Sequence, residues 1–239
     1  MKSPDFKLLV FDWDGTLMDS EAHIVSCLQA ASAELELEPL PDAVMKNIIG
    51  LGLRDAVDTL YPGRDEEFRQ RFGAAYRRHF FAPTETPSRL FSGARETLLE
   101  LRERGYLLAV ATGKGRQGLD KALHDSGLAP LFHSTRCAEE AGSKPDPRML
   151  LEILEETGIE AAETVMIGDT EYDMQMAFNA RTHAVAVSYG VHDRERLLRW
   201  RPLACLDAIT ELSDWLEHYR TRDTLASRDG TADGFGEYT

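Results

Sequence analysis

The chain has 239 residues, of which 43% are hydrophobic, and a formal net charge of -14. This length and composition allow one larger domain, or a core domain with a smaller insertion. The acidic balance argues against nucleic acid or an anionic membrane as the main partner, because phosphate backbones are bound by basic surfaces. A small phosphorylated molecule remains open as a partner, since a local site can gather positive charge whatever the overall charge.

The cysteines and the apolar runs bear on where the protein works. Cys27, Cys137 and Cys205 are far apart and form no Cys-x-x-Cys pair. No run of about 18 apolar residues occurs. The first residues lack the basic region and long apolar stretch of a signal peptide. We therefore expect a cytoplasmic protein that is neither secreted nor inserted in a membrane.

The first predicted element is a buried strand that ends in two aspartates. An apolar run over residues 8–11 is followed by Asp12, Asp14 and the turn residue Gly15. Ligand sites in open α/β sheets gather at such carboxyl ends. Two close carboxylates repel each other unless a cation is bound or one of them is protonated, so the pair indicates metal chemistry, acid–base chemistry or both. A solvated acidic turn is the alternative.

The pattern then changes to helices without strands, which predicts an inserted small helical bundle over residues 19–85. Four aromatic residues recur at a spacing of four and are interpreted as a packing stripe rather than a ligand site; they are Phe68, Phe72, Tyr76 and Phe80. A linker at each end of the insertion would make it a hinged lid.

Three further apolar runs, at residues 107–111, 165–167 and 184–187, each follow a helical pattern. Strands and helices that alternate in this way predict a parallel sheet with helices on both faces, a Rossmann-like α/β core.

These elements divide the chain into three parts. We expect a catalytic core from residues 1–18 and 86–219, which ends in an amphipathic helix over residues 207–219, and a helical cap over residues 19–85. Residues 220–239 are polar and carry too little apolar surface to fold alone, so we expect a disordered tail.

Two loops supply candidate phosphate contacts. Thr112, Gly113 and Lys114 follow the second apolar run and lead into a helix, where a hydroxyl and backbone amides can bind phosphoryl oxygens. Lys114 could equally be a solvated surface charge. Lys144 lies in a proline-flanked loop that would hold a catalytic cation rigidly, although an ordinary exposed lysine is the alternative.

A last acidic cluster follows the 165–167 run. Asp169 and Asp173 stand at another strand end, where both could face one metal ion.

In their order and residue types, these motifs resemble the haloacid dehalogenase superfamily of phosphotransferases. They are Asp-Trp-Asp-Gly-Thr, Ala-Thr-Gly, Lys-Pro and Gly-Asp-Thr-Glu-Tyr-Asp, and the resemblance extends from about Phe6 to Tyr219. The helical insertion after the first motif resembles that family's C1 cap. The phosphoglycolate phosphatase group is most similar, through Phe-Asp-x-Asp-Gly-Thr-Leu-x-Asp-Ser, although Gly113 stands where that group often carries Asn.

The resemblance implies a nucleophile and an acid. Asp12 would attack phosphorus and form an aspartyl-phosphate. Asp14 would protonate the leaving oxygen and later deprotonate water. Since hydrolytic dehalogenases and phosphonate hydrolases of this family lack the second aspartate, Asp14 favours a phosphate ester or anhydride as substrate.

The resemblance also implies a Mg²⁺ site. Its ligands would be Asp12, the backbone carbonyl of Asp14, and Asp169. Asp173 would hold metal-bound waters or orient Lys144.

Thr112 and Lys144 would neutralise the phosphoryl oxygens in the transition state. The glycine-containing loop before Arg54 resembles the family's substrate-specificity loop, and we expect Arg54 to bind a second anionic group of the substrate. An exposed helix arginine is the alternative. His23 is expected to be structural or solvated.

The leading hypothesis is a Mg²⁺-dependent phosphatase that acts on a small phosphomonoester, phosphoglycolate-like or a sugar phosphate. A phosphomutase of the β-phosphoglucomutase kind, a pyrophosphatase or nucleotidase, and a non-catalytic metabolite-binding regulator are the alternatives. The expected partner is a small phosphorylated metabolite, and the sequence leaves open whether the protein is a monomer or a homodimer.

Overall fold

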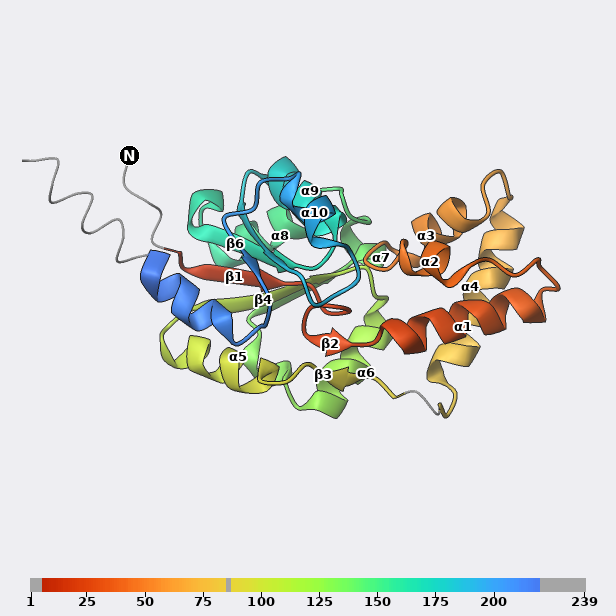
Figure 1. The fold of residues 1–239 in the computed structure, drawn as a ribbon, viewed down its shortest axis with the longest axis horizontal. Helices are drawn as coiled ribbons and strands as arrows, with labels where there is room; N and C mark the ends of the chain where they lie inside the picture. Colours follow the sequence, from red (N-terminus) through yellow and green to blue (C-terminus); the bar gives the residue numbers. More distant parts are fainter. Residues whose placement is uncertain (1–5, 85–86, 220–239) are drawn as a thin grey trace, which may run out of the picture.

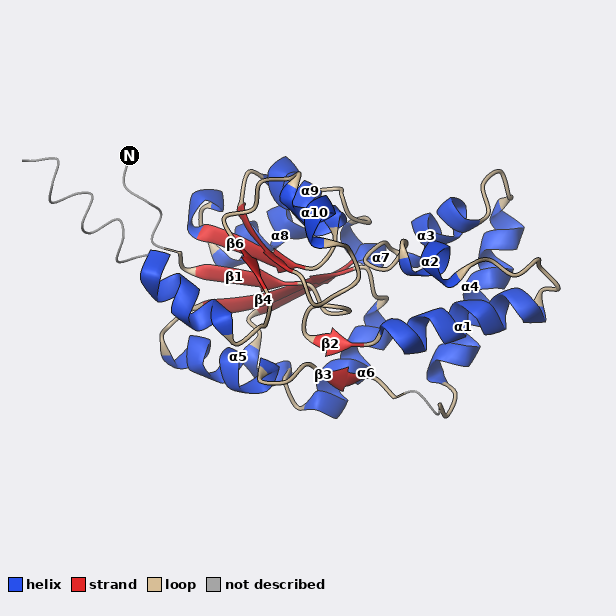
Figure 2. Ribbon diagram, viewed as in Figure 1, coloured by secondary structure: helices blue, strands red, loops and turns tan. Residues whose placement is uncertain are grey.

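The computed structural model describes residues 6–84 and 87–219; the tail predicted over residues 220–239 lies outside these ranges. Its centre is a six-stranded parallel sheet in the order β5-β4-β1-β6-β7-β8, shown in Figures 1 and 2. The strands are β1 (Leu8–Phe11), β4 (Leu107–Thr112), β5 (Ser134–Cys137), β6 (Thr164–Gly168), β7 (His183–Val187) and β8 (Cys205–Leu206). The predicted parallel α/β core is confirmed.

The sequence pattern did not predict the two edge strands. β5 has the sequence Ser-Thr-Arg-Cys, and β8 has only two residues, so neither forms an apolar run. An edge strand has a neighbour on one side only, and a short or polar strand is tolerated there.

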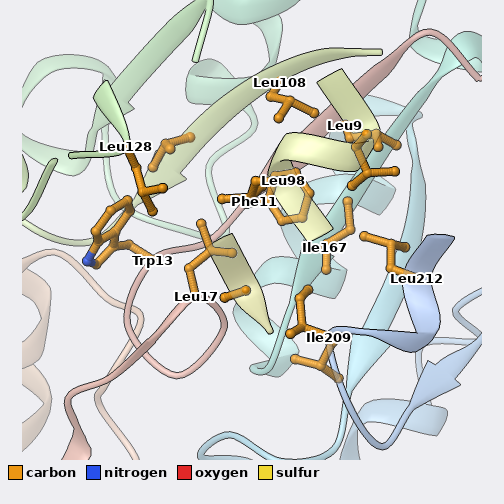
Figure 3. Packing of buried hydrophobic residues seen from close by; sticks show 14 of the residues in the cluster. Leu9, Phe11, Trp13, Leu17, Leu98, Leu108, Leu128, Ile167, Ile209 and Leu212 are labelled. Atoms are coloured by element: carbon orange, nitrogen blue, oxygen red, sulfur yellow. The ribbon is translucent and has the colours of Figure 1, made fainter. Parts of the chain in front are cut away.

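Side chains that alternate along each strand bury the two faces of the sheet under different helices. Leu9 and Phe11 pack beneath α5 (Ala94–Glu103), α6 (Arg116–Ser126) and a helix over residues 211–219. Figure 3 shows this layer, with Phe11 close to Leu98 and Ile167.

The opposite face is covered by α8 (Arg148–Thr157) and α9 (Glu171–Ala180), which pack on Leu8 and Val10. The predicted last helix begins at residue 211 rather than 207, because residues 207–210 form a turn.

Four helices after β1 gather beside one end of the sheet (Figure 1), and we call them the cap helices. They are α1 (Glu21–Glu34), α2 (Asp42–Lys46), α3 (Leu53–Leu60) and α4 (Glu66–Phe81). They share a core of their own around Leu28, Val57 and Phe72. The exact boundaries of core and cap stay a prediction.

The connections to the cap helices run side by side. β2 (Met18–Asp19) pairs antiparallel with β3 (Arg89–Leu90). The two connections between core and cap helices are thereby held together by one small two-stranded ribbon.

Two short helices, α7 (Ala138–Ala141) and α10 (Arg194–Leu198), complete the core, with 3-10 turns at Ala129–Leu131 and Ala161–Glu163.

The strand order fixes the place of the site. After β1 the chain builds β4 and β5 on one side and then β6, β7 and β8 on the other, so the direction of winding changes at β1. Ligands of open α/β sheets bind at such a switch point, outside the carboxyl ends of the strands.

None of the helices in the described ranges combines the length and apolar character that a membrane crossing needs.

Candidate active site

A buried lysine lies between two buried carboxylates, one directly after β1 and the other in the first turn of α9. Lys144 Nζ is 2.7 Å from Asp12 Oδ1 and 2.7 Å from Asp173 Oδ1, and the three side chains are at most 1% exposed. Burial alone would lower the pKa of Lys144, but the attraction of the two carboxylates outweighs it and raises that pKa. The lysine is therefore charged at neutral pH.

The two carboxylate oxygens of Asp12 differ in their surroundings. Oδ1 accepts a hydrogen bond of 2.7 Å from the Trp13 amide and faces Lys144. Oδ2 is buried and has no hydrogen-bond partner within the described part of the chain. Leaving a buried acceptor unpaired costs about 1–3 kcal/mol. An oxygen kept in this state fits binding or reaction with a ligand better than structural support.

Three carboxylates converge around this oxygen. Asp12, Asp169 and Asp173 each offer an oxygen, and these oxygens lie within 4.8 Å of one another. Carboxylate oxygens are the ligands that Mg²⁺ prefers. The cluster could therefore hold a divalent cation, and it contains the two predicted ligand carboxylates together with Asp173.

Burial, with a smaller effect of the neighbouring carboxylates, raises the pKa of two of these groups. Burial is the largest cause for both Asp12 and Asp169, and neighbouring carboxylates add to it, so that the pKa of Asp169 reaches about 7. Hydrogen bonds to Asp169 from the Thr16 hydroxyl, at 2.8 Å, and from the Val191 amide, at 2.9 Å, act in the opposite direction. A bound cation would remove the repulsion that remains.

Helix α9 fixes the orientation of Asp173. Its Oδ2 accepts hydrogen bonds from the Thr170 amide, at 3.0 Å, and from the Thr170 hydroxyl, at 2.6 Å, in a capping box at the helix start. The other oxygen is thereby left facing Lys144. Whether Asp173 holds metal-bound waters or orients Lys144 stays a prediction.

Asp14 has a separate set of partners. Its Oδ1 accepts a hydrogen bond of 2.6 Å from the Ser20 hydroxyl, and its Oδ2 lies 2.9 Å from Lys114 Nζ. The Lys114 side chain is 8% exposed, and its ammonium lies 4.6 Å from the centre of the Phe80 ring. The interpretation of Lys114 as a solvated surface charge is therefore wrong.

The sequence pattern gave Ser20 no role in the site and predicted only a packing role for Phe80. Ser20 closes the Phe-Asp-x-Asp-Gly-Thr-Leu-x-Asp-Ser stretch, and that position was the available signal. Phe80 gave no separate signal, because its helical spacing is that of any packing residue.

Thr112 is the last residue of β4 and Gly113 follows it, and both line the same cavity as Asp12 and Asp14. The buried Thr112 hydroxyl oxygen accepts a hydrogen bond of 3.2 Å from the Lys114 amide, so its hydrogen is available to donate. A Cβ at Gly113 would overlap the backbone carbonyls of Gly50 and Leu51. The glycine therefore allows the loop between α2 and α3 to rest on the end of β4.

That loop, residues 47–52, also makes hydrogen bonds to the core. The Tyr172 hydroxyl donates to the Asn47 carbonyl at 2.8 Å, and the Gly52 amide donates to Ser143 Oγ at 2.8 Å. The cap helices are thus docked on the core in this structure.

A cavity of about 820 Å³ lies between the core and the cap helices. Asp12, Asp14, Thr112 and Lys144 line its core side. Tyr76 and Phe80 line its cap side, so half of the predicted packing stripe also faces the site, whereas Phe72 is fully buried in the cap core.

Two other residues of the cap helices, Arg54 and His23, have partners within the cap. Arg54 lines the cavity, but its guanidinium lies 2.8 Å from Glu66, and its side chain is 68% exposed. Its role in substrate binding stays a prediction. His23 faces the Phe80 carbonyl at 3.3 Å, and burial lowers its pKa, in agreement with a structural role.

Comparison with known proteins identifies the family. The model of the haloacid dehalogenase-like hydrolase family matches residues 9–187. The chain belongs to this family. Two relatives are each 32% identical: the "Probable phosphatase IndB" of Dickeya dadantii, aligned over 86% of this chain and 91% of the relative, and the phosphoglycolate phosphatase of Rhodospirillum rubrum, over 88% and 90%.

Solved structures agree on the fold of this haloacid dehalogenase-like hydrolase. A hydrolase from Pseudomonas syringae superposes with a TM-score of 0.81 at 22% identity, covering 90% of this chain and 99% of that one. The predicted resemblance to the phosphoglycolate phosphatase group and the predicted enzyme class, a phosphoric monoester hydrolase, are confirmed.

The raised pKa of Asp169 leads to a first prediction. Between its usual pKa of about 3.9 and the folded value of about 7, the folded metal-free protein binds more protons than the unfolded chain, so stability falls as pH rises through this window. We expect Asp169→Asn, which removes the charge, to raise the melting temperature in EDTA by about 2–4 °C at pH 8. A gain as large at pH 4 as at pH 8 would contradict this account.

The close approach at Gly113 leads to a second prediction. Gly113→Ala places a methyl group against backbone atoms of the 47–52 loop, so the cap helices dock less closely. We expect a fall in phosphatase kcat/KM of at least about fivefold, equivalent to about 1 kcal/mol, with the melting temperature nearly unchanged. Gly73→Ala, where the added Cβ meets only ordinary contacts, is the matched control. Equal kcat/KM for the two variants would show that the contact is unimportant.

Proposed function

We propose that this protein is a Mg²⁺-dependent phosphatase that hydrolyses a small phosphomonoester through an aspartyl-phosphate on Asp12. The observation that carries the proposal is the Asp12 carboxylate, one oxygen of which is held by Lys144 and the Trp13 amide while the other has no hydrogen-bond partner in the described chain. A nucleophile needs a fixed orientation and an oxygen that is not engaged.

Two displacements at phosphorus complete the reaction. In the first, Asp12 Oδ2 forms a bond to phosphorus while the bond from phosphorus to the ester oxygen breaks. Asp14 gives a proton to that leaving oxygen. In the second, water attacks the same phosphorus and Asp14 takes up its proton. The bond to Asp12 breaks, and inorganic phosphate and the free carboxylate remain.

The surrounding groups stabilise charge on the phosphoryl oxygens. Lys144 supplies a fixed positive charge beside Asp12, and the Thr112 hydroxyl can donate a hydrogen bond. Asp12, Asp169 and the backbone carbonyl of Asp14 would hold the metal ion, and Asp173, the third carboxylate of the cluster, would hold metal-bound waters or orient Lys144. When bound, Mg²⁺ would neutralise charge on the phosphoryl group and offset the repulsion among the carboxylates.

The relatives support a small substrate, phosphoglycolate-like or a sugar phosphate. The Rhodospirillum rubrum relative is named a phosphoglycolate phosphatase.

Cys27, Cys137 and Cys205 are all free, which supports a reducing, cytoplasmic location.

The decisive experiment measures phosphate release from p-nitrophenyl phosphate and a panel of phosphometabolites. We expect activity that requires Mg²⁺ and falls by at least about 10³-fold in Asp12→Asn, because the variant lacks the nucleophile. Asp120→Asn, an exposed aspartate paired with Arg116 on α6, is the matched control and should keep its activity.

Retained activity in Asp12→Asn would remove that residue as the nucleophile. Product analysis completes the test, since an isomerised sugar phosphate in place of free phosphate would identify a phosphomutase. A protein that binds one compound of the panel but hydrolyses none would be a metabolite-binding regulator.

A further inference from the structure

The first turn of α9 points side chains in two directions. Asp173 faces Lys144 in the site. One residue earlier, the Tyr172 hydroxyl donates a hydrogen bond of 2.8 Å to the Asn47 carbonyl. Successive residues of a helix project about 100° apart, so a single turn can make both contacts. The helix that presents Asp173 to the site therefore also holds the loop over residues 47–52.

Arg196 of α10 binds the side chain of the same loop residue. Its guanidinium donates a hydrogen bond to Asn47 Oδ1 and pairs with Glu171, the first residue of α9. A guanidinium carries five N–H donors in one plane, so it can serve both acceptors at once. The side chains of Arg196 and Glu171 are 29% and 23% exposed, so solvent screens their attraction only in part. Asn47 is thus held at its backbone and at its side chain.

Side-chain packing supports these hydrogen bonds. The ring centres of Tyr172 and the buried His192 are 5.2 Å apart in an edge-to-face arrangement, which restricts the Tyr172 ring. A Cβ at Gly50 would lie 3.1 Å from the Thr170 hydroxyl oxygen, so the loop backbone approaches the start of α9 closely. Val191 packs against the core of the cap helices. The loop is therefore fixed at α9 as well as at the end of β4.

The same loop forms one wall of the cavity. Residues 48–52 line the cavity together with Asp12 and Asp14. A loop that lifts from the core would admit water, and exclusion of water strengthens the electrostatic contacts made to a reacting phosphoryl group. The position of the loop therefore bears on the reaction itself.

We infer that Tyr172 and Arg196 are positioning residues for phosphoryl transfer, because they fix Asn47 and, through it, the loop that forms this wall. The inference rests on the phosphatase function proposed above. We call Asn47, Glu171, Tyr172 and Arg196 the loop anchor. None of the four is among the described residues that line the cavity, so the loop anchor acts on the reaction only through the loop.

Hydrogen exchange of the Gly52 amide measures whether the loop anchor holds the loop. This amide donates to Ser143 Oγ of the core, so its exchange requires the loop to leave the core. We expect Arg196→Met to speed the exchange by at least about tenfold, because a hydrogen bond from a charged group is lost. Tyr172→Phe removes a neutral hydrogen bond, keeps the ring, and should speed the exchange by about fivefold.

Steady-state kinetics with p-nitrophenyl phosphate and Mg²⁺ measure the effect on the reaction. We expect kcat to fall by at least about fivefold in Arg196→Met, with a smaller change in KM, because the contacts that bind the phosphoryl group come from the core. Asn47→Leu should match this fall. Asn47→Asp keeps an acceptor for the guanidinium and should retain most of the wild-type kcat. The double variant Asn47→Leu, Arg196→Met should lose little more than either single variant, since both changes remove the same contact.

Arg194→Met is the matched control. Arg194 belongs to the same helix as Arg196 and pairs with Asp207 of the core. The variant should keep the wild-type exchange rate of the Gly52 amide and the wild-type kcat.

Three results would overturn the inference while leaving the phosphatase function intact. They are an unchanged kcat in both Arg196→Met and Tyr172→Phe, a fall in kcat without faster exchange of the Gly52 amide, and losses of kcat that multiply in the double variant. An equal loss in Arg194→Met would overturn it as well. Failure of the wild type to release phosphate from any ester, p-nitrophenyl phosphate included, would instead remove the proposed function and the inference with it.

Discussion

The site depends on holding like charges together away from water at the ends of three strands. Lys144, buried between Asp12 and Asp173, makes this arrangement possible, because its ammonium is shared by two carboxylates that would otherwise repel each other. Four carboxylates and two ammonium groups meet here, which leaves a formal charge of -2 when all are ionised; they are Asp12, Asp14, Asp169, Asp173, Lys114 and Lys144. A divalent cation would balance that charge.

Such a cluster reduces the stability of the fold, and the rest of the core offsets this cost. The raised pKa values of Asp12 and Asp169 mean that the folded state disfavours their charged forms. Apolar layers on both faces of the sheet, with β1 fully buried at its centre, hold the carboxylates in place. Burying like charges at the site destabilises the fold, whereas the apolar layers around the site stabilise it. This division is common at functional sites.

The cap helices contribute to the chemistry as well as covering it. The Phe80 ring of α4 lies over the ammonium that contacts Asp14, and Gly113 lets the 47–52 loop rest on the strand end. Docking of the cap helices and the surroundings of the proposed acid are therefore connected through Lys114. A substrate that binds there contacts both parts of the protein at once.

The sequence by itself determined the parallel core and the residues at its strand ends, because an apolar run and the polar residue that ends it are local features. Asp12, Asp14, Thr112 and Asp169 could be found in this way, whereas the polar or very short strands β5 and β8 could not. Only the tertiary structure decided which side chains meet. Lys114 contacts Asp14 across 100 positions of the chain, and Arg54 lies beside Glu66 on another helix. Contacts of this kind follow from how helices and strands pack, which no local pattern records.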